Sequence, residues 1–300
     1  MTLSNRKILR TLLCLLAGTL YAVCLSACDA KEPLSENRDA EIESPVIAND
    51  LSNQKVTAIA EDTQGHIWIG TFRGLNKNNV HDYHQYFCTD DSLGLPDNQI
   101  THLLRDSKNR FWVGTVNGVC LYTDKDNFRI IPIEADNKNV RQILEDRNGR
   151  IFLNTGFQLY AYHPREEKIT CVLPEISPGN AFYAQCHIAP DNNLWVMTST
   201  GLRCYDPSTL QLKESVALSG YPYYSYLHNN ELWITGNHTL SIFDTRTHSF
   251  KPLPQPIAHN TTLCNADIDY IHPYGNNGLL LNTARHGMFY YNPGTGSVTR

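Results

Sequence analysis

Short apolar segments separated by polar turns recur along the chain from about residue 50 onward. The clearest extends from His66 to Thr71, and a similar segment extends from Arg110 to Thr115. In both, apolar residues occupy consecutive positions around a tryptophan, so both faces of the strand must be covered. The pattern therefore predicts strands packed between two layers, not strands with one solvated face.

The tryptophan position returns roughly every 38 to 47 residues, which is the length of one supersecondary unit and too short for a domain. Six copies can be aligned on it. The six anchor positions are Trp68, Trp112, Phe152, Trp195, Trp233 and Leu280. Around each anchor the order is the same: an apolar strand, a tight turn, the anchor strand, a short loop and a third strand, with a fourth strand after it.

Four antiparallel strands per unit are typical of a β-propeller blade. We therefore predict an all-β fold, a β-propeller with four-stranded antiparallel blades, over residues 50–300. Six units are visible, and the sixth ends at residues 296–300, in what should be its fourth strand. Closure as a six-bladed ring would need residues 44–49 to supply that outer strand. We expect instead that the propeller is truncated at the C-terminus and belongs to a seven-bladed or longer array.

The N-terminus carries a targeting segment over residues 1–28. Three basic residues precede an apolar stretch at residues 12–25, and small residues then lead to Cys28. This ending resembles a bacterial lipoprotein cleavage box, in which Cys28 would be lipidated; an ordinary signal peptide and an uncleaved signal anchor are the alternatives. Residues 29–49 are polar and predict a flexible tether. We expect a periplasmic, membrane-anchored protein.

Composition limits the classes of partner. The chain is 41% hydrophobic and 18% charged, enough for one large core, and its net charge of -5 argues against nucleic-acid binding. Six cysteines follow Cys28 without C-x-x-C spacing, so the sequence predicts neither a zinc site nor a disulfide framework. Their redox state stays open. No spacing indicates a metal, a cofactor or a catalytic triad.

An acid recurs at the turn before the anchor strand. The residues concerned are Asp62, Asp106, Asp146 and Asp191. Aspartate caps tight turns through its side chain, and the Gly or Asn that follows tolerates positive φ. Because the same acid recurs in four units, we interpret these carboxylates as structural and discount them as catalytic acids.

The units anchored at Trp68 and Trp112 resemble the two-component regulator propeller repeat. The first copy matches at residues 56–59, 62, 65, 67–71 and 74–75, and the second at residues 95–100, 112–115 and 118–119. The resemblance implies the periplasmic sensor region of a bacterial hybrid two-component histidine kinase, many of which respond to glycan fragments. The residues present contain no kinase or phosphotransfer motif, whereas a longer parent could be a histidine kinase.

Loops that differ between units are free to specialise. Loops joining second to third strands, and fourth strands to the next first strand, open on one face of a propeller. Amide, Arg, His and aromatic groups there suit a small polar ligand such as an oligosaccharide. The predicted ligand-binding residues are Arg73, Asn98, Asn117, Tyr183, Tyr224, Arg285 and His286.

Two other function classes stay open. A propeller enzyme, either a lyase or a glycan-active enzyme, could use His286 or Asp97 at the same face, because propellers support both binding and catalysis. A lipoprotein that binds protein partners is the third possibility, and a homodimer or contacts with further propeller blades would fit it. We favour the non-enzymatic ligand-binding propeller.

Overall fold

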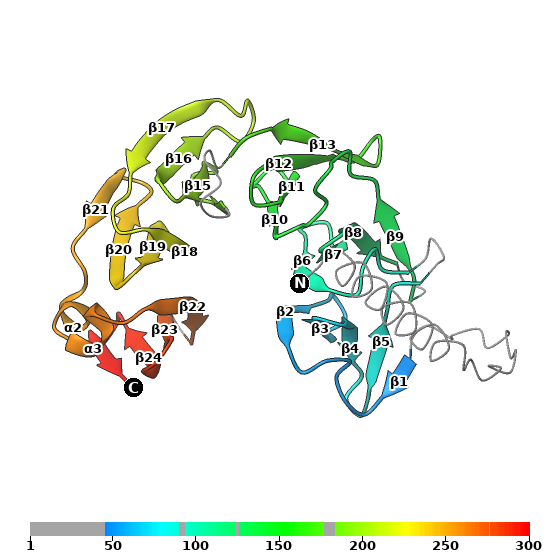
Figure 1. The fold of residues 1–300 in the computed structure, drawn as a ribbon, viewed down its shortest axis with the longest axis horizontal. Coiled ribbons are helices and arrows are strands. Elements are labelled where there is room, and N and C mark those ends of the chain that lie inside the picture. The colour runs from blue at the N-terminus through cyan, green and yellow to red at the C-terminus, as the bar shows by residue number, and fades with distance from the viewer. Residues whose placement is uncertain (1–45, 90–93, 124–125, 177–183, 276) are drawn as a thin grey trace, which may run out of the picture. The chain divides into compact units, whose positions relative to one another are not determined.

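The computed structural model describes residues 46–89, 94–123, 126–176, 184–275 and 277–300. These residues form six antiparallel sheets that follow one another along the chain (Figure 1), and the described helices are two single turns. The prediction of an all-β propeller with four-stranded antiparallel blades is confirmed, with a fifth strand added to blade 1.

The strands of each blade occupy consecutive stretches of sequence. Blade 1 contains β1 (Val46–Ala48), β2 (Val56–Glu61), β3 (Ile67–Thr71), β4 (Gly74–Asn78) and β5 (Tyr83–Tyr86). Blade 2 contains β6 (Ile100–Arg105), β7 (Phe111–Thr115), β8 (Gly118–Tyr122) and β9 (Phe128–Ile131). Blade 3 contains β10 (Gln142–Glu145), β11 (Ile151–Asn154), β12 (Leu159–His163) and β13 (Lys168–Leu173).

The second half of the chain repeats this order. Blade 4 contains β14 (Gln185–Ile188), β15 (Leu194–Thr198), β16 (Gly201–Tyr205) and β17 (Leu212–Ala217). Blade 5 contains β18 (Pro222–His228), β19 (Glu231–Gly236), β20 (Thr239–Asp244) and β21 (Ser249–Lys251). The short helices α2 (Gln255–Ala258) and α3 (Thr261–Cys264) lead to blade 6, with β22 (Ile268–Tyr274), β23 (Gly278–Thr283), β24 (Gly287–Asn292) and β25 (Ser297–Thr299).

Each anchor residue lies on the second strand of its blade, between the first and third strands. Trp68, Trp112 and Trp195 are fully buried, and Trp233 is 1% exposed. The first strands of successive blades contact one another, so neighbouring sheets cover the faces of each anchor strand. The prediction that the anchors are buried between blades is confirmed for the tryptophans and for Phe152.

An apolar cluster fills each junction between successive blades. An aromatic residue on the third strand of the following blade packs on the anchor tryptophan. The ring centroids of Trp68 and Tyr122 are 4.7 Å apart, and those of Trp112 and Tyr162 are 4.9 Å apart. Such edge-to-face pairs add to the burial of both rings. The regular spacing of aromatic residues in the repeat therefore places one ring of each pair on either side of the junction between two blades.

The outer edge of blade 1 differs from our expectation. Residues 46–48 lie in the segment predicted to be a tether, but they form β1 and pair antiparallel with β5. The idea that this segment would supply an outer strand to the sixth unit is wrong. Blade 6 has its own fourth strand, β25, which pairs with β24. Residues 1–45, including Cys28, lie outside the described part of the chain.

All six cysteines of residues 46–300 are described. Cys120, Cys186 and Cys204 are buried, whereas Cys88 and Cys171 are exposed and Cys264 is intermediate. Only half of them therefore serve as small buried apolar groups. No helix within the described ranges is long and apolar enough to cross a membrane.

Candidate functional site

The loops between second and third strands lie beside the connections that lead into the first strands, as predicted for one face of a propeller. The backbone nitrogen of Gly74 donates to the carbonyl of Asn98 at 2.6 Å, and that of Val116 donates to Gln99 at 3.2 Å. Gly74 has φ +113° and lies against Tyr86 and Phe87, so a side chain there would be strained and would clash. We call this side of the molecule the loop face.

Three predicted binding residues lie at the loop face between blades 1 and 2. Arg73 and Asn117 are exposed on neighbouring second-to-third loops. Asn98 is partly buried, and its Oδ1 accepts from the backbone nitrogen of Cys88 at 2.7 Å. The Asn98 side chain therefore holds the connection between blades, while the other two side chains reach solvent. Ligand binding by these three residues stays a prediction.

Tyr224 lies apart from those three, on strand β18. Its hydroxyl donates to the carbonyl of Ile271 at 3.3 Å, and its ring packs edge-on against Tyr270 at 5.4 Å. Burial raises the pKa of Tyr224 to about 12. The side chain thus joins blades 5 and 6. Tyr183 lies outside the described residues.

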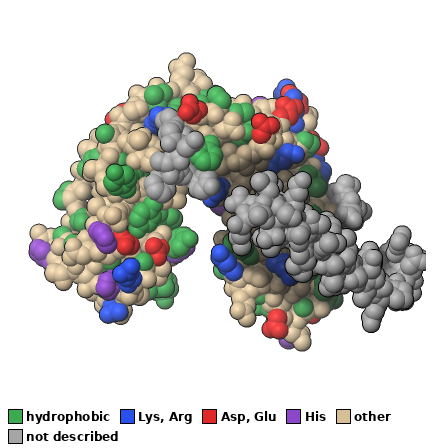
Figure 2. Space-filling model, viewed as in Figure 1, with side chains coloured by type: hydrophobic (Ala, Val, Ile, Leu, Met, Phe, Trp, Pro, Cys, Tyr) green, Lys and Arg blue, Asp and Glu red, His purple; other side chains and the backbone are tan. Residues whose placement is uncertain are grey.

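The remaining two residues, Arg285 and His286, line a pocket of 420 Å³ at the loop face between blades 5 and 6. The pocket combines the second-to-third loops of both blades with the segment that enters β22. Its lining consists of Asn237, His238, Asn265, Ala266, Asp267, Ala284, Arg285 and His286. Figure 2 shows His, basic and acidic side chains gathered over these last two blades.

Local hydrogen bonds fix the backbone around this pocket. At the end of β23, Thr283 Oγ1 donates to the carbonyl of Gly287 at 2.7 Å and accepts from the backbone nitrogen of His286 at 3.0 Å. Threonine recurs at this position in other blades, where Thr71 and Thr115 make the same bond across their loops. The repeat therefore supplies a rigid loop, and the residues inside the loop supply the variation.

The polar groups of the pocket fall into two sets. Asp267 Oδ1 accepts from the backbone nitrogen of His238 at 3.0 Å, and His238 Nδ1 lies 3.1 Å from the carbonyl of Asn265. Asp267 and Asn265 are thus both in hydrogen-bond contact with His238. In contrast, the guanidinium of Arg285 and the imidazole of His286 have no hydrogen-bond or ion-pair partner among the described residues. Donors that are left free at a fixed loop can bind an acceptor-rich ligand.

Sequence reasoning did not select Asp267 or Asn265 as site residues. Both lie in the long connection between blades 5 and 6, which includes α2 and α3 and makes the spacing from Trp233 to Leu280 the longest of the series. The long spacing is the sequence feature that indicates these residues. An insertion between the fourth strand of one blade and the first strand of the next lies on the loop face.

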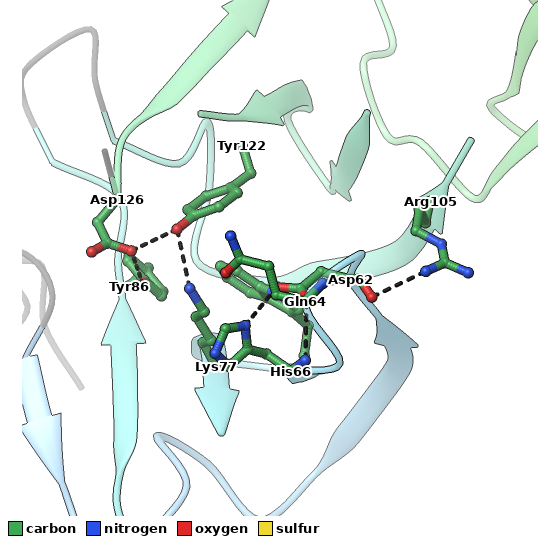
Figure 3. A network of polar contacts seen from close by, with 9 residues as sticks. Asp62, Gln64, His66, Lys77, Tyr86, Arg105, Tyr122 and Asp126 are labelled. Atoms are coloured by element: carbon green, nitrogen blue, oxygen red, sulfur yellow. Dashed lines mark hydrogen bonds and ion pairs between the residues drawn. The ribbon is translucent and has the colours of Figure 1, made fainter. Parts of the chain in front are cut away.

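A second polar cluster lies between blades 1 and 2, at the end of the strands opposite the loop face (Figure 3). Asp126 accepts from the hydroxyls of Tyr86 and Tyr122 at 2.6 and 2.7 Å. Burial alone would raise the pKa of Asp126, but these two donors and the nearby Lys77 outweigh it and lower the pKa. The neighbouring cavity measures only 150 Å³. Because these polar groups bond mainly to one another, we interpret the cluster as a structural junction.

Across the described ranges, no group of three or more His, Cys, Asp or Glu side chains is arranged to hold a metal ion.

Comparison with known proteins supports the repeat assignment. The sequence model of the two component regulator propeller matches residues 50–73 and 94–117. Two of the six units are therefore similar to the two-component regulator propeller repeat. The two matches contain Trp68 and Trp112 with their preceding turns, and they end in the second-to-third loops of blades 1 and 2. Curated protein sequences give no match.

Solved structures share the propeller fold of this chain. Extracellular domains of a putative one-component system and of a putative hybrid two-component system from B. thetaiotaomicron align with TM-scores of 0.67 and 0.66, at 15% and 19% identity. The alignments cover 86% and 84% of this chain but only 38% and 36% of those chains. Virginiamycin B lyase from Staphylococcus aureus aligns with a TM-score of 0.62 at 16% identity, covering 85% of this chain and 86% of the lyase.

Proposed function

We propose that this regulator propeller is the extracytoplasmic ligand-binding part of a signalling protein, and that it binds a small polar ligand, most simply an oligosaccharide, without changing it chemically. The two regulator propeller repeats and the shared fold with extracellular domains of putative signalling systems support this class. The chain spans little more than a third of those extracellular domains, so the signalling role is part of this proposal.

The observation that carries the proposal is the pocket of Arg285 and His286. Its 420 Å³ lies within the usual size of small-molecule sites, roughly 300 to 1,000 Å³. The Arg285 guanidinium can donate to paired hydroxyls or to a uronic carboxylate, while Asp267 and Asn237 can accept from hydroxyls. The pocket thus offers both donors and acceptors, as a sugar requires.

Calorimetry with a panel of oligosaccharides tests this proposal. The variant Arg285→Ala should weaken binding of the recognised sugar by about 1.5 to 3 kcal/mol, the range for hydrogen bonds to charged groups. Arg165→Ala is the matched control, because Arg165 is exposed at a third-to-fourth turn, away from the loop face. Calorimetry on Arg73→Ala tests whether the binding site extends to blades 1 and 2.

Three results would contradict the proposal. Unchanged affinity in Arg285→Ala together with a loss in Arg165→Ala would mean that the wrong face was chosen. If no sugar of the panel binds, the proposal that the ligand is an oligosaccharide is contradicted. Consumption of a sugar would favour an enzyme, for which His238, 3.3 Å from Asp267 Oδ1, and His286 would be the first groups to replace.

Localisation is part of the same proposal. We propose export to the periplasm and membrane attachment through a lipid on Cys28. Fractionation of cells that express Cys28→Ser, with labelled fatty acid, tests the attachment. The substituted protein should lose the label and leave the membrane fraction; retention of both would contradict the lipoprotein interpretation, and retention in the membrane alone would indicate a signal anchor.

A further inference from the structure

The fourth strand of blade 5 covers only half of the strand beside it. β21 pairs with β20 at three positions, from Ser249 opposite Asp244 to Lys251 opposite Ile242. Residues 239–241, the first half of β20, pair with β19 on one side and with no strand on the other. Among the described residues, their backbone groups make no hydrogen bond outside the sheet. β20 therefore presents an open edge three residues long.

The equivalent stretch is covered in the preceding blade. Counted from the anchor tryptophans, residues 201–203 of β16 are equivalent to residues 239–241, and they pair with residues 215–217 of β17. β21 stops earlier because prolines follow it. Pro252 has no N–H to donate, and the carbonyl of Pro254 accepts from a backbone nitrogen of α2 as the chain turns away. Blade 5 therefore lacks the second half of its outer strand.

A groove of 440 Å³ lies along this open edge. Its lining consists of Ala217, Leu218, Ser219, Leu240, Ser241, Phe250, Lys251 and Leu253. The apolar side chains of the groove belong to both faces of the sheet. Phe250 packs on Phe243, and Leu218 joins the same apolar cluster between blades 4 and 5. Leu240 and Leu253 join the cluster between blades 5 and 6. The groove therefore straddles the edge of β20.

An extended polypeptide matches both features of the groove. Its backbone supplies the N–H and C=O groups that an open sheet edge pairs with, and its side chains alternate between the two faces of the sheet. A purely apolar ligand would fill the walls but leave the edge unpaired. The only charged side chain in the lining is Lys251, whose Nζ is already paired with Glu231. Backbone pairing and small apolar side chains, and not charge, thus set the preference.

We propose that this groove binds an extended segment of a partner protein, which adds to blade 5 as the missing half of its outer strand. The segment pairs antiparallel with residues 239–241, and recognition by strand addition of this kind gains affinity from the main chain and specificity from alternate side chains. Small or β-branched apolar side chains fit between Leu218 and Leu240, as Val216 and Ala217 fit in blade 4. The groove shares no lining residue with the pocket of Arg285.

A synthetic peptide with the sequence of residues 213–218 is the probe, because this segment contains the residues that cover the equivalent stretch in blade 4. Titration of the peptide into ¹⁵N-labelled protein should shift the backbone amide signals of residues 239–241 saturably. It should also slow the hydrogen exchange of the amides that point outward from this edge. The amide signals of residues 201–203, which β17 already covers, should stay in place.

Two further peptides test the backbone pairing itself. Each carries one N-methyl group, on the valine in the first and on the following alanine in the second, so that one N–H donor is removed. Successive N–H groups of a strand point to opposite sides, and only one side meets β20. One peptide should therefore lose affinity by at least about fivefold, the effect of one typical hydrogen bond, while the other binds like the unmodified peptide.

A pair of protein variants tests the position of the site. Ala217 is exposed and lines the groove, so Ala217→Trp should fill the groove and weaken peptide binding by at least about fivefold. Ser215→Trp is the matched control. Ser215 is also exposed and lies two residues earlier on the same face of β17, but it is not part of the groove, so affinity should not change. If Ala217→Trp fails to fold, the two methylated peptides decide the question with the unaltered protein.

The proposal is overturned by any of three results: no saturable shift at residues 239–241, equal affinity of the two methylated peptides, or equal effects of the two tryptophan variants. Self-association of the protein that Ala217→Trp abolishes, measured by light scattering, would also overturn it, because a second copy would then occupy the groove. None of these results bears on the oligosaccharide pocket, which calorimetry on Arg285→Ala tests separately.

Discussion

Trp68 Nε1 donates a 2.9 Å hydrogen bond to Oδ2 of Asp62, six residues earlier in the chain. The other carboxylate oxygen of Asp62 accepts from the backbone nitrogens of Gln64 and His66. One side chain therefore closes the hairpin turn and also satisfies the buried indole. Trp112 and Asp106 repeat the arrangement at 2.8 Å. This double role accounts for the pairing of the acid with the tryptophan in blades 1 and 2.

The first prediction concerns Asp106→Ala. The change leaves the buried Trp112 Nε1 without an acceptor and removes a partner of Arg110, whose Nε lies 2.6 Å from the Asp106 carboxylate. We expect a loss of about 1 to 3 kcal/mol in the free energy of unfolding, measured by urea denaturation. Asp191→Ala is the control, because Asp191 caps a turn without reaching Trp195, and it should cost clearly less.

Equal losses in the two variants would contradict this account. They would mean that turn capping alone sets the effect and that the indole hydrogen bond adds nothing to stability.

A second prediction compares two anchor positions. Trp112→Ala removes a fully buried ring from the junction of blades 2 and 3 and should cost about 3 to 5 kcal/mol. Leu280→Ala should cost less, because Leu280 is only partly buried and blade 6 carries exposed Tyr270 and Met288. Thermal or urea unfolding of both variants measures the difference. A milder effect at Trp112 than at Leu280 would contradict the assigned register.

The recurring part of the fold could be predicted from the sequence because repetition marks it. The anchors and the turn acids have one role in several blades, so six copies reveal a pattern that one copy would not. The loop Thr71 belongs to the same class, since its bond across the loop recurs at Thr115.

Features that occur once could not be predicted in this way. Strand β1 is three residues long and lies in a polar stretch, and its pairing with β5 depends on a free sheet edge and not on its own composition. The pocket of Arg285 depends on Asp267, which an irregular connection brings to it. Tyr224 lies within strand β18 and not in the loop that the sequence predicts, and its hydroxyl donates to blade 6.

The third prediction is a loss of stability in mild acid. His102 and His187 are partly buried on first strands, and the removal of their imidazoles from water lowers the pKa of each to about 4. In the unfolded chain each has a pKa of about 6.5, so the unfolded state binds more protons between those values. Stability is therefore complete above about pH 6.5 and falls as the pH drops toward 4, by up to roughly 3 kcal/mol for each histidine.

Urea denaturation across this pH range checks the prediction. His102→Gln and His187→Gln should each flatten the pH dependence between 6.5 and 4, whatever they do to stability at pH 7. His286→Gln is the control, since that imidazole is exposed and has no hydrogen-bond partner among the described residues. A pH dependence that neither buried substitution alters would mean that other groups govern acid unfolding.

The last prediction concerns β1. This strand covers the outer edge of blade 1, where Val46 pairs with Gln85 and Ala48 with Tyr83. An uncovered edge strand presents unpaired N–H and C=O groups that invite pairing with another chain. The fourth strands of blades 2 to 6 also end their sheets, so a chain beginning at Asn49, whose β5 edge is newly uncovered, should associate more readily with rising concentration than a chain beginning at Ser44. Size-exclusion chromatography with light scattering measures this difference.

The variant Ile47→Ser distinguishes the effect of backbone pairing by β1 from the effect of the Ile47 side chain. Ile47 is 63% exposed, so its side chain contributes little burial, and the strand should still pair and prevent association. Hydrogen exchange gives the direct check, because amides of residues 46–48 that are hydrogen-bonded to β5 should exchange more slowly than in a free peptide. Exchange at the free-peptide rate, or a shortened chain that stays monomeric, would show that β1 does not protect the edge.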